Sequence, residues 1–473
     1  MDATEFRHWS HRLADWMADY LEQVESYPVR SQAAPGSIFS QVPPAPPAAG
    51  EPMEAIFADF ERIVMPGITH WQSPNFFAYF PANTSYPSLL AEMLTAALGV
   101  QGMIWETSPA AAELEEAMMN WLRGLAGLPA AWSGVIQSTA SEATLAALLT
   151  AREQASEYGI NESGFAGQPV FRVYASGQAH SSIEKGVKIA GFGRRNVVKI
   201  PVDEAFAMRP EALEAAIQAD LAAGLRPCCA IAALGTTSST AMDPLRAIGE
   251  ICRRYGIWLH VDAAYAGSAF ILPECRSWLD GIELADSFVF NPHKWLFTHF
   301  DCSAYFVRDP GALVRTFEIL PEYLKTAAAG VNNYRDWGIP LGRRFRALKL
   351  WFVMRSFGAE GMQARLREHL RLGQLLAAWV DAHPDFERLA PVPLNLVCFR
   401  WHPQDQHDPA ALDALNEQLL SSLNLEGRIY LTHTRLNGVY TLRMVMGHPD
   451  VTEAHVRQAW ELIQARSAQI AAR

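Results

Sequence analysis

Short apolar segments alternate with helical patterns between about residues 130 and 310, and this alternation limits the fold more than any other sequence feature. The predicted strands are residues 134–137, 170–174, 197–200, 228–234, 257–261, 287–290 and 304–307. Helical patterns lie between many of them, at 141–158, 210–223 and 245–255. Nearly continuous apolar strands joined by helices form a largely parallel sheet with helices on both faces. We therefore predict an α/β fold with a seven-stranded sheet, in which ligands bind at the carboxyl ends of the strands.

The N-terminal segment has a different character. Its apolar residues recur at spacings of three and four, which predicts an amphipathic helix; they are Phe6, Trp9, Leu13, Trp16, Met17, Tyr20, Leu21 and Val24. Residues 28–52 contain seven prolines and read as an extended connection, and a second amphipathic stretch follows at 53–65. Such an arm either packs on a partner subunit or folds back on its own chain, and on the residues alone both alternatives remain open.

The segment after about residue 360 predicts a smaller α+β domain. A long helical stretch is followed by strands near 394–400, 428–432 and 440–446 and by a final helix from Val451.

Composition excludes several classes of partner. Lys plus Arg is 39 and Asp plus Glu is 50, so the net charge of -11 disfavours a nucleic-acid backbone. The six cysteines have no CxxC or Cys/His metal-ligand spacing, so we expect neither a disulfide scaffold nor a metal site. No run reaches the ~18 apolar residues of a membrane helix, and the start Met-Asp-Ala-Thr-Glu lacks a signal-peptide pattern. We expect a cytoplasmic protein without a membrane or nucleic-acid partner.

Two polar segments follow the first two predicted strands. Residues 137–144, QSTASEAT, place small hydroxyl residues where a strand turns into a helix, an arrangement that can bind phosphate. The alternative is an ordinary Ser or Thr N-cap. Residues 178–182 contain His180, whose imidazole could stack on a flat ring or act as an acid or base. The alternative is a histidine that is merely hydrogen-bonded.

Two further segments follow later strands. Asp262 ends a very apolar strand, where a carboxylate needs a cationic or strong donor partner, although Asp is also a frequent helix N-cap. Lys294 follows a buried strand between aromatic residues, where desolvation favours a Schiff-base amine. Its alternative is a lysine that reaches the surface. Together the four segments supply a phosphate cradle, a stacking imidazole, an acid and an imine-forming lysine, which pyridoxal phosphate requires.

With these segments the sequence resembles the pyridoxal-phosphate-dependent aromatic-L-amino-acid decarboxylase family over nearly its whole length. The most specific combination is Asn-Pro-His-Lys-Trp at 291–295 with His-Val-Asp-Ala-Ala-Tyr at 260–265. Further matching segments are 75–81, 107–110, 300–303 and 339–346.

The resemblance implies a role for individual residues. Lys294 would bind the cofactor covalently, Asp262 would pair with its ring nitrogen, and His180 would stack on the ring. The remaining cofactor contacts that it implies are Ala140, Ser141, Thr237, Ala264, Asn291 and His293. The substrate pocket that it implies consists of Trp71, Tyr79, Phe80, Pro81, Met103 and Gly342. Tyr323, in a loop at 321–335 that we expect to be mobile, would deliver a proton.

The implied reaction is decarboxylation of an aromatic L-amino acid (DOPA, Trp, Tyr or Phe) to the arylalkylamine and carbon dioxide. Related aldehyde synthases typically have Phe at the position of Tyr323, so the hydroxyl favours simple decarboxylation over aldehyde synthesis. Gly342 disfavours histidine as the substrate. Ala82, Gln101 and Met103 depart from several relatives and could reshape the pocket. The alternatives are aldehyde synthesis, another fold type I reaction, or a catalytically silent scaffold.

The resemblance also implies a quaternary structure. The family has fold type I architecture and forms homodimers, with the active site at the subunit interface. The implied division is a helical arm at 1–85 on the partner subunit, a large cofactor-binding domain at 86–360 and a small C-terminal domain at 361–473. Met103 would reach the pocket of the neighbouring subunit.

Overall fold

The computed structural model describes residues 1–319 and 330–472. The chain separates into two compact units. One contains residues 1–81, 371–389 and 395–473, and the other contains 82–370 and 390–394. The predicted division into an arm (1–85), a large domain (86–360) and a small domain (361–473) stays a prediction. The two compact units are defined by contacts within one chain, whereas the predicted arm is defined by its packing on a partner subunit. In the described residues, no helix has both the length and the apolar character needed to cross a bilayer.

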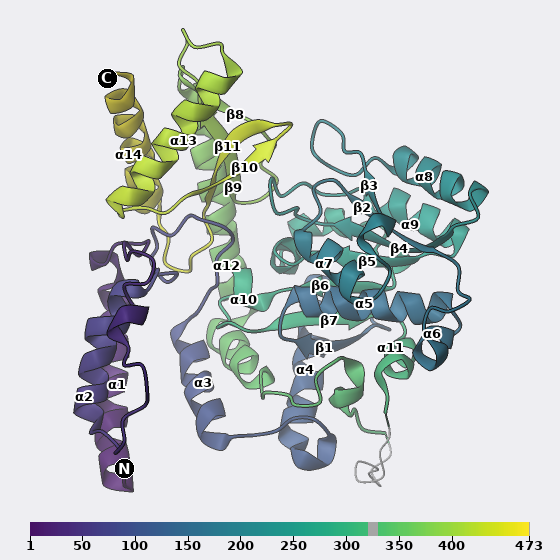
Figure 1. Cartoon of the computed structure of the whole chain (residues 1–473), viewed down its shortest axis with the longest axis horizontal. Coiled ribbons are helices and arrows are strands. Elements are labelled where there is room, and N and C mark those ends of the chain that lie inside the picture. Colours follow the sequence, from purple (N-terminus) through teal and green to yellow (C-terminus); the bar gives the residue numbers. More distant parts are fainter. Residues whose placement is uncertain (320–329, 473) are drawn as a thin grey trace. The chain divides into compact units, whose positions relative to one another are not determined.

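The larger unit is built on a seven-stranded sheet, as predicted (Figure 1). Its strands are β1 (Ser133–Gln137), β2 (Phe171–Ser176), β3 (Val197–Ile200), β4 (Arg226–Ala233), β5 (Trp258–Asp262), β6 (Ser287–Phe290) and β7 (Ser303–Val307). Each lies within two residues of its predicted bounds, because long apolar runs fix where a buried strand begins and ends. The spatial order is β1-β7-β6-β5-β4-β2-β3, and only β7 runs antiparallel to its neighbours.

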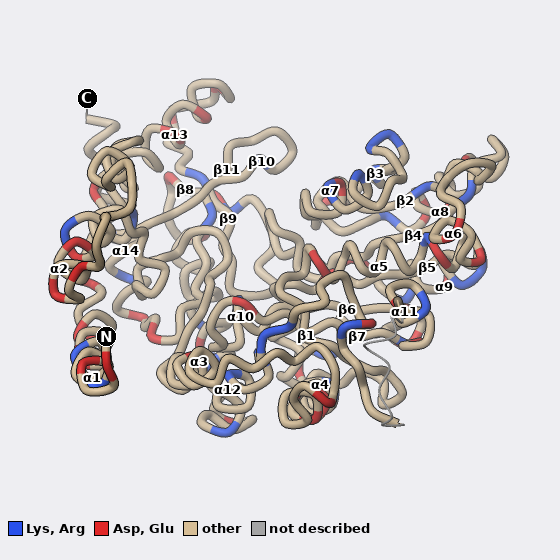
Figure 2. The backbone as a smooth tube through the Cα atoms, turned by 60° about the horizontal axis from the view of Figure 1, so that its bottom comes forward, with Lys and Arg blue, Asp and Glu red and all other residues tan. Residues whose placement is uncertain are grey.

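Helices cover both faces of this sheet, since every residue of β5, β6 and β7 is buried. Helices α5 (Ala140–Ala155) and α7 (Ser181–Ile189) share one apolar cluster with β2 and β4, and α5 and α11 (Pro310–Phe317) share another with β1, β6 and β7. Helices α8 (Pro210–Ala222) and α9 (Leu245–Tyr255) pack on β4. The strands are mostly uncharged, and charges gather in helices and connections (Figure 2). Asp262 is the only Asp, Glu, Lys or Arg in β5, β6 and β7.

The larger unit contains further helices. They are α3 (Tyr86–Leu98), α4 (Pro109–Ala126), α6 (Gly159–Ser163) and the short α10 (Pro292–Trp295). The long predicted helix after about 360 is part of α12 (Ala347–Ala382), which is broken at Gly358, where φ is 65°.

The smaller unit contains an antiparallel sheet of order β10-β11-β9-β8. Its elements are β8 (Phe386–Arg388), β9 (Leu396–Trp401), α13 (Pro409–Glu426), β10 (Thr432–Leu436), β11 (Val439–Val445) and α14 (Glu453–Ala471). The predicted strand at 428–432 is wrong in its position. Asn437 and Gly438 both have positive φ and form the tight turn of a hairpin that pairs Leu436 with Val439, so this turn sets the strand bounds.

Both predicted helices of the N-terminal segment are present in the same unit. Helix α1 (Ala3–Glu22) packs on α2 (Met53–Asp59) through aromatic side chains, because the ring of Trp16 contacts those of Phe57 and Phe60 at centroid distances of 5.9 and 5.3 Å. Part of the apolar stripe of α1 is therefore covered within its own chain. Phe6 remains 62% exposed.

Candidate active site

Lys294 lies directly beyond the carboxyl end of β6, in α10. The backbone N–H of Asn291 donates to the carbonyl of Ala264 at 3.0 Å, and the N–H of Lys294 donates to the carbonyl of Asn291 at 2.9 Å. Its neighbour Trp295 is fully buried and stacks on Tyr265 at 4.8 Å. Lys294 itself is half-buried, which fits a lysine held at the edge of the sheet better than one that extends into solvent.

Asp262 ends β5, the neighbouring strand. Its side chain is 9% exposed, and Oδ1 accepts a hydrogen bond from the N–H of Ala264 at 3.0 Å. One backbone donor offsets only part of the cost of burying a carboxylate, so Asp262 is suited to a further cationic or N–H partner.

His180 begins α7 beyond the end of β2. Its Nδ1 accepts from the N–H of Ser182 at 3.2 Å, so the alternative prediction of a hydrogen-bonded cap also describes it. The residue nevertheless remains exposed. Desolvation by the surrounding protein lowers the pKa of His180, Asp262 raises it and Lys294 lowers it. Asp262 and Lys294 thus affect the pKa of this imidazole, and the parallel strands β2, β5 and β6 bring the three residues to the same edge of the sheet.

Several hydrogen-bond donors lie at the edge of the sheet where β1 and β6 end. The antiparallel strand β7 lies between these two strands and begins at the same edge. Ser303 at the start of β7 pairs with Gln137 at the end of β1, and its Oγ donates to Oδ1 of Asn291 at 2.6 Å. This contact occupies Oδ1 and so orients the Asn291 amide, whose Nδ2 is a hydrogen-bond donor. The sequence analysis missed Ser303, because only the antiparallel return of β7 brings it beside Asn291.

His293 is a second donor at this place. Its Nδ1 accepts from the N–H of Cys302 at 2.9 Å, so the proton of the neutral ring is on Nε2. Burial, followed by the charge of Lys294, lowers the pKa of His293 to about 3. The ring is therefore a neutral Nε2–H donor at physiological pH.

The first turn of α5 completes this donor set. Thr139 is an N-cap whose hydroxyl accepts from the N–H of Glu142, and Glu142 in turn accepts from the N–H and hydroxyl of Ser138. For Thr139 the ordinary capping alternative is correct. The N–H groups of Ala140 and Ser141 lie in the first turn, where a helix offers no acceptor, and remain suited to an anion.

Thr237 lies in the turn that follows β4. This turn approaches the segment after Asp262 so closely that a Cβ on Gly235 would lie 2.6 Å from Cβ of Ala266, and φ of Gly235 is +83°. Thr236 accepts from the N–H of Ala241 at 3.0 Å and fixes the turn that presents Thr237.

The predicted substrate residues fall into two groups. Trp71, Tyr79, Phe80 and Pro81 belong to the smaller unit, where Trp71 stacks on Phe76 and Tyr79 at 4.3 and 5.8 Å. Met103 and Gly342 belong to the larger unit. Tyr323 and most of the predicted mobile loop lie outside the described residues.

The structure brings the Met103 and Gly342 segments together. The carbonyl of Met103 accepts from the N–H of Arg335 at 2.9 Å. Oε1 of Gln101 accepts from the N–H of Arg343 at 2.5 Å, and a Cβ on Gly342 would lie 3.3 Å from Nε2 of Gln101. Arg343 also pairs with buried Glu115 and donates to the carbonyl of Ile136 at 3.0 Å, which ties the segment to β1.

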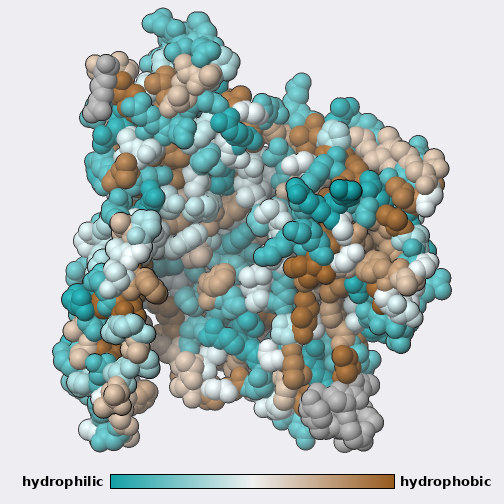
Figure 3. Space-filling model, viewed as in Figure 1, coloured by the Kyte–Doolittle hydropathy of each residue, from teal (hydrophilic) through white to brown (hydrophobic). Residues whose placement is uncertain are grey.

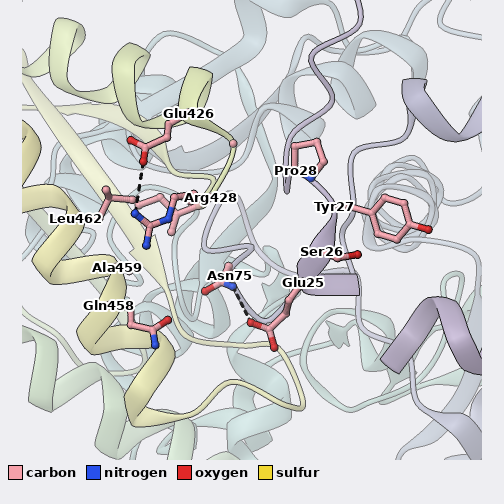
Figure 4. Close-up of a pocket in the computed structure, with 12 residues that line it drawn as sticks. Glu25, Ser26, Tyr27, Pro28, Asn75, Glu426, Arg428, Gln458, Ala459 and Leu462 are labelled. Atoms are coloured by element: carbon pink, nitrogen blue, oxygen red, sulfur yellow. Dashed lines mark hydrogen bonds and ion pairs between the residues drawn. The ribbon is translucent and has the colours of Figure 1, made fainter. Parts of the chain in front are cut away.

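A cavity of about 330 Å³ in the smaller unit contains none of the predicted site residues (Figure 4). Its lining is polar, with Asn75 donating to Glu25 at 3.1 Å and Arg428 paired with Glu426 at 3.5 Å. These groups bind one another.

Known proteins have sequences and folds similar to those of this chain. The family model "Pyridoxal-dependent decarboxylase conserved domain" matches residues 35–402. An aromatic-L-amino-acid decarboxylase of Sus scrofa is 45% identical over 100% of this chain and 98% of its own length. A phenylacetaldehyde synthase of Arabidopsis thaliana is 42% identical over 98% of this chain and 96% of its own length. The crystal structure of Oryza sativa TDC with PLP and tryptamine has a TM-score of 0.96 and 37% identity, and covers 99% of both chains.

The prediction of a fold type I α/β architecture is thus confirmed by sheet order and by structural likeness. The strand-end residues and these matches lead to one conclusion: the chain belongs to the family of pyridoxal-dependent decarboxylases.

Proposed function

We propose that this protein decarboxylates an aromatic L-amino acid to the corresponding arylalkylamine and carbon dioxide, with pyridoxal 5'-phosphate as its cofactor. The observation that carries the proposal is the convergence of Lys294, Asp262 and His180 at the ends of three strands, where the first two act electrostatically on the third. The similar aromatic-L-amino-acid decarboxylase of Sus scrofa supports an aromatic substrate.

The chemistry of the residues fits this cofactor. Donors without an acceptor role suit a phosphate; they are the N–H groups of Ala140 and Ser141, Nδ2 of Asn291 and Nε2 of His293. Asp262 suits a protonated ring nitrogen, and the ring of His180, an exposed residue, suits a flat aromatic neighbour. The Lys294 amine suits an aldehyde. Thr237 and Ala264 would complete the contacts from the turns after β4 and β5.

When bound, the cofactor supplies an electron sink for the bond that breaks at Cα. Asp262 would hold a proton on the ring nitrogen, because a buried carboxylate with one backbone donor gains from a positive partner. His180, with its lowered pKa, would lie against the ring as a neutral imidazole. Lys294 would bind the aldehyde between turnovers, and its amine would release the product. Tyr323 would donate the proton that Cα receives.

The residues that we assign to the substrate ring are Trp71, Tyr79, Phe80 and Pro81 in the smaller unit, and Met103 and Gly342 in the larger unit. Aromatic side chains exclude water and offer no cation to an acidic substrate. Removal of water around the substrate carboxylate favours its loss as neutral carbon dioxide.

Aldehyde synthesis is the second candidate, because the Arabidopsis thaliana phenylacetaldehyde synthase is 42% identical to this chain. The Tyr323 hydroxyl favours simple decarboxylation, because protonation of Cα then competes with oxygen. Tyr323→Phe should therefore shift the products from amine toward aldehyde and peroxide. Unchanged amine formation by this variant would remove Tyr323 from the proton-transfer step.

A homodimer with the active site at its interface is part of the proposal. Five apolar side chains of helix α3 are exposed, namely Tyr86, Leu90, Met93, Leu94 and Leu98. Apolar side chains also reach the surface around α1 and α2 (Figure 3). A second copy of this chain would cover such side chains, with the N-terminal arm on the partner and Met103 reaching the partner's pocket. A cytoplasmic location stays a prediction of the sequence.

The test is a panel of L-tryptophan, L-tyrosine, L-phenylalanine, L-DOPA, L-histidine and L-glutamate with separate assays for amine, carbon dioxide and peroxide. We expect equal amounts of amine and carbon dioxide from at least one aromatic substrate, little peroxide, and no turnover of glutamate. Lys294→Ala is the control and should be inactive. Formation of peroxide and aldehyde in stoichiometric amounts would show that the reaction is aldehyde synthesis and not simple decarboxylation. Absence of turnover with every aromatic substrate would overturn the proposal.

A further inference from the structure

Tyr79 has an unusual backbone conformation. Its φ is 51°, in the left-handed region that bulky side chains avoid. Such conformations persist only where surrounding contacts hold them, and they gather at functional sites. The contacts that hold Tyr79 therefore identify residues on which the aromatic group of Trp71, Tyr79 and Phe80 depends.

Tyr430 is the first of these residues. Its carbonyl accepts from the N–H of Phe77 at 3.0 Å, and its N–H donates to the carbonyl of Asn75 at 3.2 Å, so 75–77 runs beside it like a strand. Its hydroxyl lies 3.3 Å from the hydroxyl of Tyr79, and the two rings meet edge to face at 6.0 Å. Burial, followed by the hydrogen bond with Tyr79, raises the pKa of Tyr430 to about 12, so this hydroxyl stays neutral and can donate.

Thr432 and Arg443 extend the same support. The N–H of Tyr79 donates to Oγ1 of Thr432 at 3.2 Å, and Nη1 of Arg443 donates to the same oxygen at 3.1 Å. The guanidinium of Arg443 lies over the ring of Phe80 at 5.4 Å. Side chains from 430–443 thus contact two adjacent residues of the predicted substrate wall.

We propose that Tyr430, assisted by Thr432 and Arg443, is a positioning residue for the aromatic ring of the substrate. Tyr430 holds Tyr79 in its left-handed conformation and fixes the wall against which the ring packs, so the small sheet sets substrate affinity without touching the reacting atoms. This inference rests on the proposed function, because it assigns the wall to an aromatic substrate.

A double-mutant cycle of Tyr79→Phe and Tyr430→Phe in the holoenzyme tests the proposal. Loss of one hydrogen bond should raise KM for the preferred aromatic amino acid about 3- to 10-fold in each single variant, with kcat within about 2-fold. The double variant should resemble the single ones, because each change removes the same contact. The apparent Kd for pyridoxal phosphate and the absorbance of the bound cofactor should not change.

Tyr440→Phe is the matched control. Tyr440 lies on β11 with a pKa that burial likewise raises to about 12, but its ring stacks on His433 at 4.5 Å, away from the substrate wall. Its KM should stay at the wild-type value. Thr432→Val is the second test variant, and it should also raise KM. It tests the proposal if Tyr430→Phe does not fold.

Several outcomes would overturn the inference. They are an unchanged KM in Tyr430→Phe, KM effects that multiply in the double variant, or parallel losses of kcat and cofactor affinity that indicate general unfolding. If wild-type enzyme makes no amine from any aromatic amino acid, the proposed function itself fails.

Discussion

His260 and Asp262 lie two residues apart on β5, so their side chains point to the same face of the sheet. His260 is fully buried between two hydroxyls, with Nδ1 2.9 Å from Oγ of Ser287 and Nε2 3.3 Å from Oγ1 of Thr144. Burial lowers its pKa to about 4, although Asp262 opposes this. A neutral histidine therefore lies behind the carboxylate that we assign to the ring nitrogen.

From the lowered pKa of His260 we predict that the free energy of unfolding falls at acid pH. Above about pH 6.5, the pKa of histidine in the unfolded chain, the ring is neutral in the folded and the unfolded protein. Its full contribution to the free energy of unfolding is therefore present there. Between pH 6.5 and about 4 this histidine binds a proton in the unfolded chain but not in the folded chain. The free energy of unfolding therefore falls by about 1.4 kcal/mol for each unit by which the pH is lowered. His260→Gln should be less stable at pH 8 but should lose this slope. Urea midpoints from pH 4 to 8 check the difference, and parallel curves for both proteins would contradict it.

The position of single residues could be predicted from the sequence where a charged residue directly follows an apolar strand. Asp262 and Lys294 stand out because a charge directly after an apolar strand is unusual, and the sheet brings them to its carboxyl edge. Ser303 and Tyr430 could not be found in this way. Tyr430 meets Tyr79 across 351 residues of sequence, and an isolated hydroxyl carries no local pattern that identifies such a partner.

At the scale of elements, the turn after β4 depends on Gly235. Its φ of +83° and the 2.6 Å approach to Cβ of Ala266 exclude any side chain. Gly256 has a comparable φ of +64° but open space around its Cα, so Gly256→Ala carries only the strain of a left-handed alanine, about 1 kcal/mol. Gly235→Ala should add a collision and displace Thr237. We expect a larger fall in melting temperature and weaker binding of pyridoxal phosphate for Gly235→Ala, and equal effects of the two variants would refute this explanation.

The strands of the large sheet could be predicted because each is a continuous apolar run, whereas β10 was misplaced. Residues 428–431 have the pattern of a strand, but the hairpin turn at Asn437 and Gly438 pairs 432–436 with β11 instead. The Asn-Gly pair was a readable signal for that register. Helices α1 and α2 were predicted from their periodicity, but their contact depends on aromatic residues that a proline-rich connection separates.

At the scale of the whole molecule, the proposed interface site predicts complementation between inactive subunits. Lys294→Ala lacks the cofactor lysine, and Met103→Arg would block the pocket of its partner. In a mixed dimer, the site with an intact Lys294 receives Met103 from the other chain, so refolded equal mixtures should recover roughly a quarter of wild-type activity. Each variant alone should be inactive. Mixtures that remain inactive, although sedimentation shows mixed dimers, would place Met103 in the pocket of its own chain.

The central claim is that the Lys294 amine binds pyridoxal phosphate, and mass spectrometry after borohydride reduction tests it most directly. The account predicts a phosphopyridoxyl group on the peptide that contains Lys294, and none on the same peptide of Lys294→Ala protein treated identically. A wild-type peptide that remains unmodified after loading with excess cofactor, or a label on another lysine that persists in the variant, would contradict the account.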